Sequence, residues 1–222
     1  MKSFAAEQIT RVRSLWDRML EHPFLIQTRD GTIPDATFAR WMRQDYLFVE
    51  AAIPFLAALL AKAPRAHWEP LHGAIGALQT ELELFEERAA AAGVDLRGAP
   101  PAFTNHAYIQ FLMATAYRAS YAEGYTVLYV AERAYHDSWK VVQAGIARDS
   151  RWYPFVENWA GDAFAGYVKY LESELDRLAA EAGPAERARM AELFELTTKY
   201  EIAFWEMAMT SEAWPGLELG DQ

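Results

Sequence analysis

Apolar residues recur along most of this chain every three or four positions, which is the spacing of one face of an α-helix. No stretch alternates apolar and polar residues as a half-buried strand does. Glycine and proline residues separate the helical segments, and Pro54 falls inside one of them, where we expect it to kink the helix. The pattern predicts an all-α protein, a bundle of about seven helices over residues 5–20, 35–63, 64–92, 104–119, 121–147, 154–182 and 184–209.

The two longest connections in this prediction are loops. Residues 22–34 contain His-Pro and Asp-Gly pairs, which are typical of turns, and residues 93–101 are rich in glycine and proline. Asp35 is the expected N-cap of the helix that follows the first loop. Since the chain has no internal repeat, no low-complexity linker and no shift in composition, we expect one domain over residues 1–222, with its core at about 4–209 and a short C-terminal tail.

Three acidic residues, Asp45, Glu132 and Glu201, stand at positions where the helical period predicts an apolar side chain. The apolar stripes around them consist of Phe38, Met42, Phe48 and Ala52, of Tyr121, Tyr125, Leu128, Tyr135 and Trp139, and of Phe194, Thr197, Phe204 and Ala208. An ionised carboxylate on a core-facing stripe is costly unless it is paired or hydrogen-bonded. Three such positions on three helices predict one polar cavity inside the bundle, and we expect the chemistry of the protein there.

Each of these acids also has a structural explanation. Glu132 can pair with His136, which lies four residues further along the same helix face. Asp45 can be neutralised by Arg43 or by a cation of a neighbouring helix. Glu201 can pair with Lys199 only if the lysine side chain reaches around the helix. Taken together, the three acids favour a shared site over three unrelated ion pairs.

Such a site suits acid–base chemistry on a flat neutral or cationic molecule. One carboxylate can hold a ring nitrogen or an exocyclic amine, while another, whose pKa is raised in an apolar pocket, moves protons. The eight Trp, eleven Tyr and twelve Phe can supply stacking faces, although aromatic side chains also fill cores. No Gly-rich loop and no arginine cluster accompanies the acids, so a phosphate substrate fits them poorly.

A carboxylate-bridged metal centre is the alternative use of the same residues. Helical bundles build di-iron centres from Glu ligands and Glu-x-x-His motifs. Of the five histidines, His136 has a carboxylate four residues earlier on the same helix face, that of Glu132. A di-iron oxygenase therefore stays open as the second hypothesis.

The composition argues against several other classes of protein. The formal net charge is −10 and there is no basic tract, so we expect no direct contact with nucleic acid. No run of about 18 apolar residues predicts a membrane span, and the N-terminal segment has the pattern of an amphipathic helix rather than of a signal peptide. The absence of cysteine excludes disulfides, thiolate metal sites and cysteine nucleophiles. We therefore expect a cytoplasmic protein that acts on a small molecule.

Several short motifs resemble those of the TenA (thiaminase II) family. They are His22-Pro23-Phe24, Asp30-Gly31-Thr32-Ile33-Pro34, Phe38, Gln44-Asp45-Tyr46, Tyr121-Ala122-Glu123 leading into Glu132 and Tyr135, and Tyr200-Glu201-x-x-Phe204-Trp205-x-Met207. The resemblance extends from about Phe4 to Met209, nearly the whole chain. It implies a haem-oxygenase-like bundle without haem or another cofactor, usually a homotetramer.

The same resemblance implies an activity and a set of site residues. Family members hydrolyse thiamin, or convert its breakdown product 4-amino-5-aminomethyl-2-methylpyrimidine to the hydroxymethyl pyrimidine and ammonia. By resemblance, Asp45 holds the amidine edge of the pyrimidine, Phe48 stacks on its ring, Tyr108 and Tyr135 line the pocket, and Glu201 is the catalytic acid or base. The family also carries a transcriptional-regulator label, which for this acidic chain would describe an indirect effect.

Two positions depart from the family pattern. Ala131 stands where the thiaminase subgroup has its nucleophilic cysteine, and a further pocket tyrosine of the family falls near Ala163 or Phe164. We expect Glu132 to take over beside Ala131, where it activates water or deprotonates the substrate while Glu201 protonates the leaving amine. Thiamin is then a poor substrate and an N-formyl aminopyrimidine an additional one. A non-catalytic ligand-binding or regulatory family member is the third hypothesis.

Overall fold

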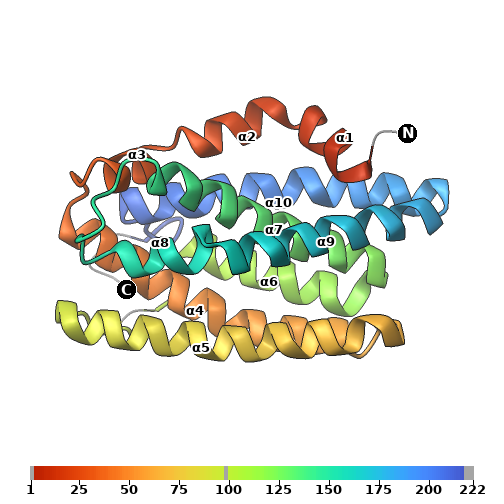
Figure 1. Ribbon diagram of the computed structural model, residues 1–222, viewed down its shortest axis with the longest axis horizontal. Coiled ribbons are helices and arrows are strands. Elements are labelled where there is room, and N and C mark those ends of the chain that lie inside the picture. The colour runs from red at the N-terminus through yellow and green to blue at the C-terminus, as the bar shows by residue number, and fades with distance from the viewer. Residues whose placement is uncertain (1–2, 98–99, 218–222) are drawn as a thin grey trace. The chain divides into compact units, whose positions relative to one another are not determined.

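The computed structural model describes residues 3–97 and 100–217, and within these ranges the chain forms ten α-helices, one short 3-10 helix and no strand (Figure 1). The elements are α1 (Phe4–Arg11), α2 (Arg13–Leu20), α3 (Pro23–Arg29), α4 (Asp35–Leu60), η1 (Arg65–His67), α5 (Trp68–Ala92), α6 (Phe103–Arg118), α7 (Tyr121–Gln143), α8 (Tyr153–Ala160), α9 (Asp162–Glu181) and α10 (Pro184–Thr210). The predicted all-α class is confirmed.

Three of the predicted long helices are each divided in two. Val12 leaves helical geometry between α1 and α2, the 3-10 helix η1 precedes α5, and Gly161 separates α8 from α9. A Cβ at Gly161 would lie 2.5 Å from the carbonyl oxygen of Glu157, so glycine is required for the chain to turn here. Pro54, in contrast, lies within α4, which continues to Leu60.

The helix α3 lies inside the segment that the sequence predicts as a loop. His22 caps its N-terminus, because the ring Nδ1 accepts a hydrogen bond from the backbone amide of Phe24 at 3.2 Å. Pro23 occupies the first turn, where its missing N–H leaves no hydrogen bond unmade. Beyond the helix end, Gly31 has φ of +68°, the left-handed conformation that favours glycine. The His-Pro pair therefore starts a helix rather than a turn.

The predicted cap of the next helix is displaced by one residue. Asp35 is the first residue of α4, and the extended Pro34 occupies the N-cap position without a side-chain hydrogen bond. As an acidic residue in the first turn, Asp35 still interacts favourably with the helix dipole. The predicted end of α5 is confirmed at Gly93, which has φ of +68°.

The helices group into two compact units. Of the described residues, the first unit comprises 3–33 and 122–206, and the second comprises 34–97, 100–121 and 207–217. None of the helices in residues 3–97 and 100–217 combines the length and the apolar character needed to cross a membrane.

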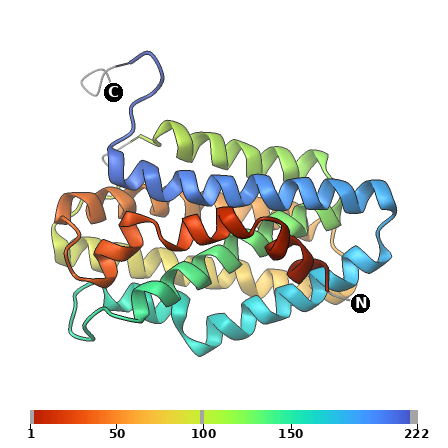
Figure 2. The ribbon, with the colours of Figure 1, turned by 90° about the horizontal axis from the view of Figure 1, so that it is seen from above.

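In the first unit, α7 is buried along most of its length and α1 packs against α9 (Figure 2). A charged network links α7 to its neighbours: Arg133 donates to Asp137 at 2.9 Å and to Glu172 of α9 at 2.8 Å. Asp137 also accepts a hydrogen bond from the indole nitrogen of Trp16 of α2 at 3.1 Å. Because each charge in the network has a partner, the half-buried guanidinium of Arg133 fixes three helices without leaving an isolated ion.

In the second unit, α4 packs against both α5 and α6 (Figure 1). The aromatic side chains of Trp41 and Tyr46 contact Phe85 of α5, with ring centroids 5.6 and 6.4 Å apart. This packing buries one face of α5, whereas much of the remaining surface of that helix is exposed.

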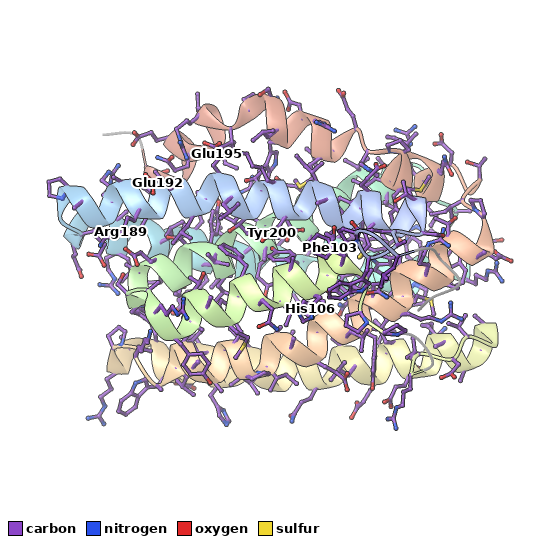
Figure 3. The ribbon with its side chains drawn as sticks, turned by 180° about the vertical axis from the view of Figure 1, so that it is seen from behind. Phe103, His106, Arg189, Glu192, Glu195 and Tyr200 are labelled. Atoms are coloured by element: carbon purple, nitrogen blue, oxygen red, sulfur yellow. The ribbon has the colours of Figure 1, made fainter. Side chains whose placement is uncertain are left out.

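The chain after α10 lies against the N-terminus of α6. Glu212 accepts hydrogen bonds from the backbone amide of Thr104 at 2.7 Å and from its hydroxyl at 2.8 Å. Its carboxylate thereby caps α6, whose own N-cap residue makes no side-chain hydrogen bond. The ring of Trp214 contacts those of Phe103 and His106, with centroids 5.5 and 5.3 Å away; Figure 3 labels both of these α6 residues.

Candidate functional site

The six predicted site residues fall into two sets of three, one in each compact unit. Asp45, Phe48 and Tyr108 belong to the second unit, and Glu132, Tyr135 and Glu201 belong to the first. Two of the six residues lie on α4, one on α6, two on α7 and one on α10.

The set in the second unit lies where α4 packs on α6. Asp45 is 0% exposed and Tyr108 is 1% exposed, while Phe48 is half-buried, so the apolar stripe around Asp45 is buried only in part. Phe48, one turn after Asp45, has its ring centroid 4.8 Å from that of Tyr108, with the ring planes at 44°. The structure thus brings two predicted substrate-binding aromatic residues into contact, on the helix face that carries Asp45.

A buried amide pair, Gln44 and Asn105, ties α4 to α6 next to this set. The Gln44 side-chain oxygen accepts hydrogen bonds from the backbone amide of Ala102 and from Asn105 Nδ2, both at 2.9 Å. The Asn105 Nδ2 also donates to the backbone carbonyl of Gln44 at 2.7 Å, and Gln44 Nε2 donates to the carbonyl of Pro100 at 3.1 Å. Gln44 precedes Asp45 directly, so this pair fixes the backbone that carries the acid.

Sequence reasoning missed Asn105 because its partner lies on another helix. The only local signal is its spacing, since Asn105 stands three residues before Tyr108 and shares its helix face. The asparagine is 0% exposed, which is rare for this residue type unless it is hydrogen-bonded.

The set in the first unit lies where α7 meets α10. Glu201 is 1% exposed, and Tyr135 is also buried, whereas Glu132 is half-buried. The ring of Tyr135 stacks on that of Trp205, one turn after Glu201, with centroids 5.3 Å apart and planes at 28°. This contact places the helix faces of Tyr135 and Glu201 against each other.

Trp205 joins three of the sequence motifs that suggested the family. Its ring stacks on Phe24 of the His-Pro-Phe motif at 5.1 Å and on Tyr135 of the central helix at 5.3 Å. Trp205 itself belongs to the motif of the last helix and is fully buried. Three motifs that are far apart in the chain therefore form one aromatic stack in the first unit.

Lys199 and His136, which lie close in sequence to the two acids of this set, each bond to another group. Lys199 Nζ bonds to Glu195 at 2.7 Å, one turn earlier, and so turns away from Glu201. His136 Nδ1 donates to the backbone carbonyl of Trp159 at 2.8 Å, which orients the imidazole ring. Within residues 3–97 and 100–217, no three His, Asp or Glu side chains group closely enough to hold a metal ion.

The further pocket tyrosine of the family falls near Ala163 or Phe164 of α9, and of these two residues Phe164 carries a ring. Its ring lies 6.1 Å from that of His136 and 6.0 Å from that of Tyr167, measured between centroids. The hydroxyl oxygen of Tyr167 is buried. The chain therefore carries a half-buried tyrosine about one turn beyond the expected position.

His22 couples the stability of this unit to pH. Its Nδ1 accepts from Phe24, so Nε2 carries the proton and donates to Glu206 at 3.1 Å. Burial lowers the pKa of His22 below its usual 6.5, and the hydrogen bond to Glu206 opposes this only in part. The unfolded chain therefore binds the proton at a higher pH than the folded protein does.

We expect the free energy of unfolding to fall as the pH is lowered from about 8 through the ordinary histidine range near 6.5. Urea unfolding at several pH values measures this, with His22→Asn as the matched control. Asparagine can still cap α3 but does not titrate. The free energy of unfolding of the variant should therefore fall less steeply over the same pH range. Equal pH slopes for the two proteins would contradict the assignment.

Comparison with known proteins relates this chain to one family. The model of the TENA/THI-4/PQQC family matches residues 9–211. A curated relative from Halalkalibacterium halodurans, named aminopyrimidine aminohydrolase, is 27% identical in an alignment of 224 positions that covers 96% of this chain and 98% of the relative. The X-ray structure of a TenA homologue from Pyrococcus furiosus is 35% identical and superposes with a TM-score of 0.90 over 92% of this chain and 99% of that one.

A more distant structure identifies the fold class. A domain from Shewanella denitrificans, described as having a heme oxygenase-like fold, is 14% identical and reaches a TM-score of 0.76 over 93% of this chain and 92% of its own. The predicted haem-oxygenase-like helical bundle is thereby confirmed.

Proposed function

Because the chain belongs to the TENA/THI-4/PQQC family, we propose that it is an aminopyrimidine hydrolase of thiamin salvage. The structural observation that carries the proposal is the burial of two carboxylates, Asp45 and Glu201, at 0% and 1% exposure. An aminopyrimidine has a cationic form and hydrogen-bond donors, so it is a chemically matched ligand for carboxylates in such an apolar setting. A relative that matches nearly the whole chain carries the corresponding name.

The proposed reaction acts on 4-amino-5-aminomethyl-2-methylpyrimidine. It replaces the amino group of the 5-aminomethyl substituent by a hydroxyl group. Water forms a bond to the exocyclic methylene carbon, and the bond from that carbon to the amine nitrogen breaks. One proton leaves the water and one proton joins the departing amine, so the products are the hydroxymethyl pyrimidine and ammonia. The reaction needs a base, an acid and a means of holding the ring.

In this proposal the residues of the second unit hold the ring. With the ring in its protonated, cationic form, the Asp45 carboxylate accepts hydrogen bonds from the amidine edge, which is the protonated ring nitrogen and the exocyclic 4-amino group. Phe48 and Tyr108, whose rings are in contact, provide an aromatic surface for the flat heterocycle. The Gln44–Asn105 pair positions Asp45 through the backbone of α4.

The residues of the first unit move the protons. Glu132 is half-buried and takes the proton from the attacking water, while the fully buried Glu201 protonates the leaving amine. Tyr135 contributes a pocket wall that Trp205 holds in place by stacking. Ala131 excludes covalent attack by a thiolate at this position, so the two carboxylates replace the cysteine chemistry of the thiaminase subgroup.

We further propose that the protein acts as a single-domain enzyme over its whole length, in the cytoplasm and as a homotetramer. These three statements follow from the family resemblance and the sequence pattern. Sedimentation velocity on the purified protein tests the tetramer.

The source of the product oxygen distinguishes this hydrolase from an oxygenase on the same scaffold. Purified protein is incubated with the aminomethyl pyrimidine in ¹⁸O-labelled water under argon, and the product is analysed by mass spectrometry. Hydrolysis predicts one ¹⁸O atom in the hydroxymethyl pyrimidine and one ammonia per product molecule. Product that forms only with dioxygen and carries no label from water would contradict the proposal.

A further inference from the structure

A cavity of about 450 Å³ lies within the second unit, separate from the residues proposed to hold the pyrimidine. Its walls come from α4, from the segment that precedes α6 and from the chain at the end of α10. The polar side chains that line it are Arg40, Arg43, Gln44, Ser211 and Glu212. None of Asp45, Phe48 and Tyr108 lines this cavity.

Two arginines, one helical turn apart on α4, dominate the charge of this cavity. Arg40 and Arg43 are both half-buried. Burial lowers the pKa of Arg40, and the nearby positive charge of Arg43 lowers it further. Two like charges on one partly desolvated wall are unfavourable unless an anion compensates them.

The structure anchors both guanidinium groups by backbone carbonyl groups. Arg40 Nε donates to the carbonyl of Ala208 at 2.8 Å, at the C-terminus of α10, and Arg43 Nε donates to the carbonyl of Asp95 at 2.8 Å. These bonds fix the orientation of the planar groups. In Arg43 they occupy only Nε, so its terminal nitrogens keep their capacity to donate.

These two residues differ from the other half-buried arginines of the described chain. Those residues all pair with a carboxylate: Arg29 with Asp30, Arg88 with Glu87, Arg133 with Asp137 and Glu172, and Arg187 with Glu7. Within residues 3–97 and 100–217, no carboxylate lies within ion-pair distance of Arg40 or Arg43. Glu212 lines the cavity, but its two oxygens accept hydrogen bonds from Thr104.

We propose that this cavity binds a phosphate monoester, with the phosphate group held between Arg40 and Arg43. Two guanidinium groups carry two positive charges and several N–H donors. A phosphate dianion, with its two negative charges and several acceptor oxygens, matches them better than a single carboxylate does. The volume exceeds what a phosphate group fills and lies in the range of small-molecule sites. Apolar residues such as Ala39 and Met207 complete the wall and can contact the organic part of the ester.

The ligand differs in chemistry from the proposed substrate, which is neutral or cationic. The cavity is therefore a second binding site, and its occupation does not depend on whether the chain hydrolyses aminopyrimidines. Gln44 lines this cavity and also hydrogen-bonds to Asn105, so the same side chain borders the cavity and the α4–α6 contact beside Asp45.

Isothermal titration calorimetry tests the proposal with three probes in a phosphate-free buffer of low ionic strength. The probes are inorganic phosphate, phenyl phosphate and phenol. We expect inorganic phosphate and phenyl phosphate to bind once per chain, the ester more tightly, and phenol not to bind at this site. Affinity should fall as salt is added, because the contact is largely ionic.

Variants assign the binding to the two arginines. Arg43→Gln should weaken phenyl phosphate binding about tenfold or more, the size expected for loss of a charge-assisted hydrogen bond. Arg43→Lys keeps the positive charge but loses the planar guanidinium group, so it should weaken phenyl phosphate binding less than Arg43→Gln does. The lysine variant also tests the proposal if the glutamine variant does not fold. Arg65→Gln, an exposed residue of η1 with the same charge change, should bind as the wild type does.

Three outcomes would overturn the proposal. The first is no binding of either phosphate compound by the wild type at millimolar concentration. The second is binding that neither Arg40→Gln nor Arg43→Gln weakens. The third is loss of phenyl phosphate binding in Asp45→Asn, which would place the ester at the pyrimidine site instead; retained binding in that variant supports the separate cavity.

Discussion

Replacement of Glu201 by glutamine is expected to lower kcat for the aminomethyl pyrimidine by about 10²–10⁴-fold, the usual contribution of a general acid or base. Glutamine has nearly the same shape and can fill the same buried position, but it cannot transfer the proton to the leaving amine. Ammonia release under steady-state conditions measures the effect. KM should change much less than kcat, because the lost interaction forms in the transition state.

Glu192→Gln is the matched control for this experiment. Glu192 lies on α10 as Glu201 does, but it is exposed (Figure 3), so the same change of charge should leave turnover near that of the wild type. Thermal unfolding of both variants checks that the fold is intact. Full turnover of Glu201→Gln on the aminomethyl pyrimidine would show that another group protonates the amine.

Truncation of Trp205 to alanine should cause the largest loss of stability, about 3–5 kcal/mol in the free energy of unfolding. The side chain is fully buried and stacks on Phe24 and Tyr135, so its removal opens a cavity between α3, α7 and α10. Urea denaturation measures the change. Turnover should fall as well in the folded fraction, because Tyr135 loses the ring that holds it.

Trp205→Phe separates the two effects. Phenylalanine keeps an aromatic face for Tyr135 while removing part of the buried volume, so its loss of stability should be clearly smaller than that of alanine. A loss below about 1 kcal/mol for Trp205→Ala would mean that the stack contributes little to stability, contrary to the cost expected for a buried aromatic ring.

The fold class could be predicted from the sequence because the period of the apolar residues is helical almost throughout. The divisions within the helices could not, since they depend on particular backbone contacts. The turn at Gly161 results from the close approach of the Glu157 carbonyl, which no local pattern reports. At α3, the His-Pro pair indicated a turn, whereas the His22 ring caps a helix there.

The candidate site was predictable only where local periodicity carries the information. Asp45 and Glu201 are buried, as their apolar stripes predict, while Glu132 is only half-buried on a stripe of similar character. The Gln44–Asn105 pair joins two helices sixty-one residues apart in the chain, and such a long-range contact has no signature in one sequence. The anchoring of Arg40 and Arg43 also has no signature in one sequence, because the carbonyl groups that accept from these arginines belong to distant segments.

The most direct test of the central claim is the rate of product formation by the purified protein with three compounds, namely the aminomethyl pyrimidine, its N-formyl derivative and thiamin. A hydrolase that uses carboxylates without a cysteine should turn over the aminopyrimidines, release ammonia from the aminomethyl compound and act poorly on thiamin. A folded protein that prefers thiamin, or that acts on none of the three compounds, would contradict the proposed function.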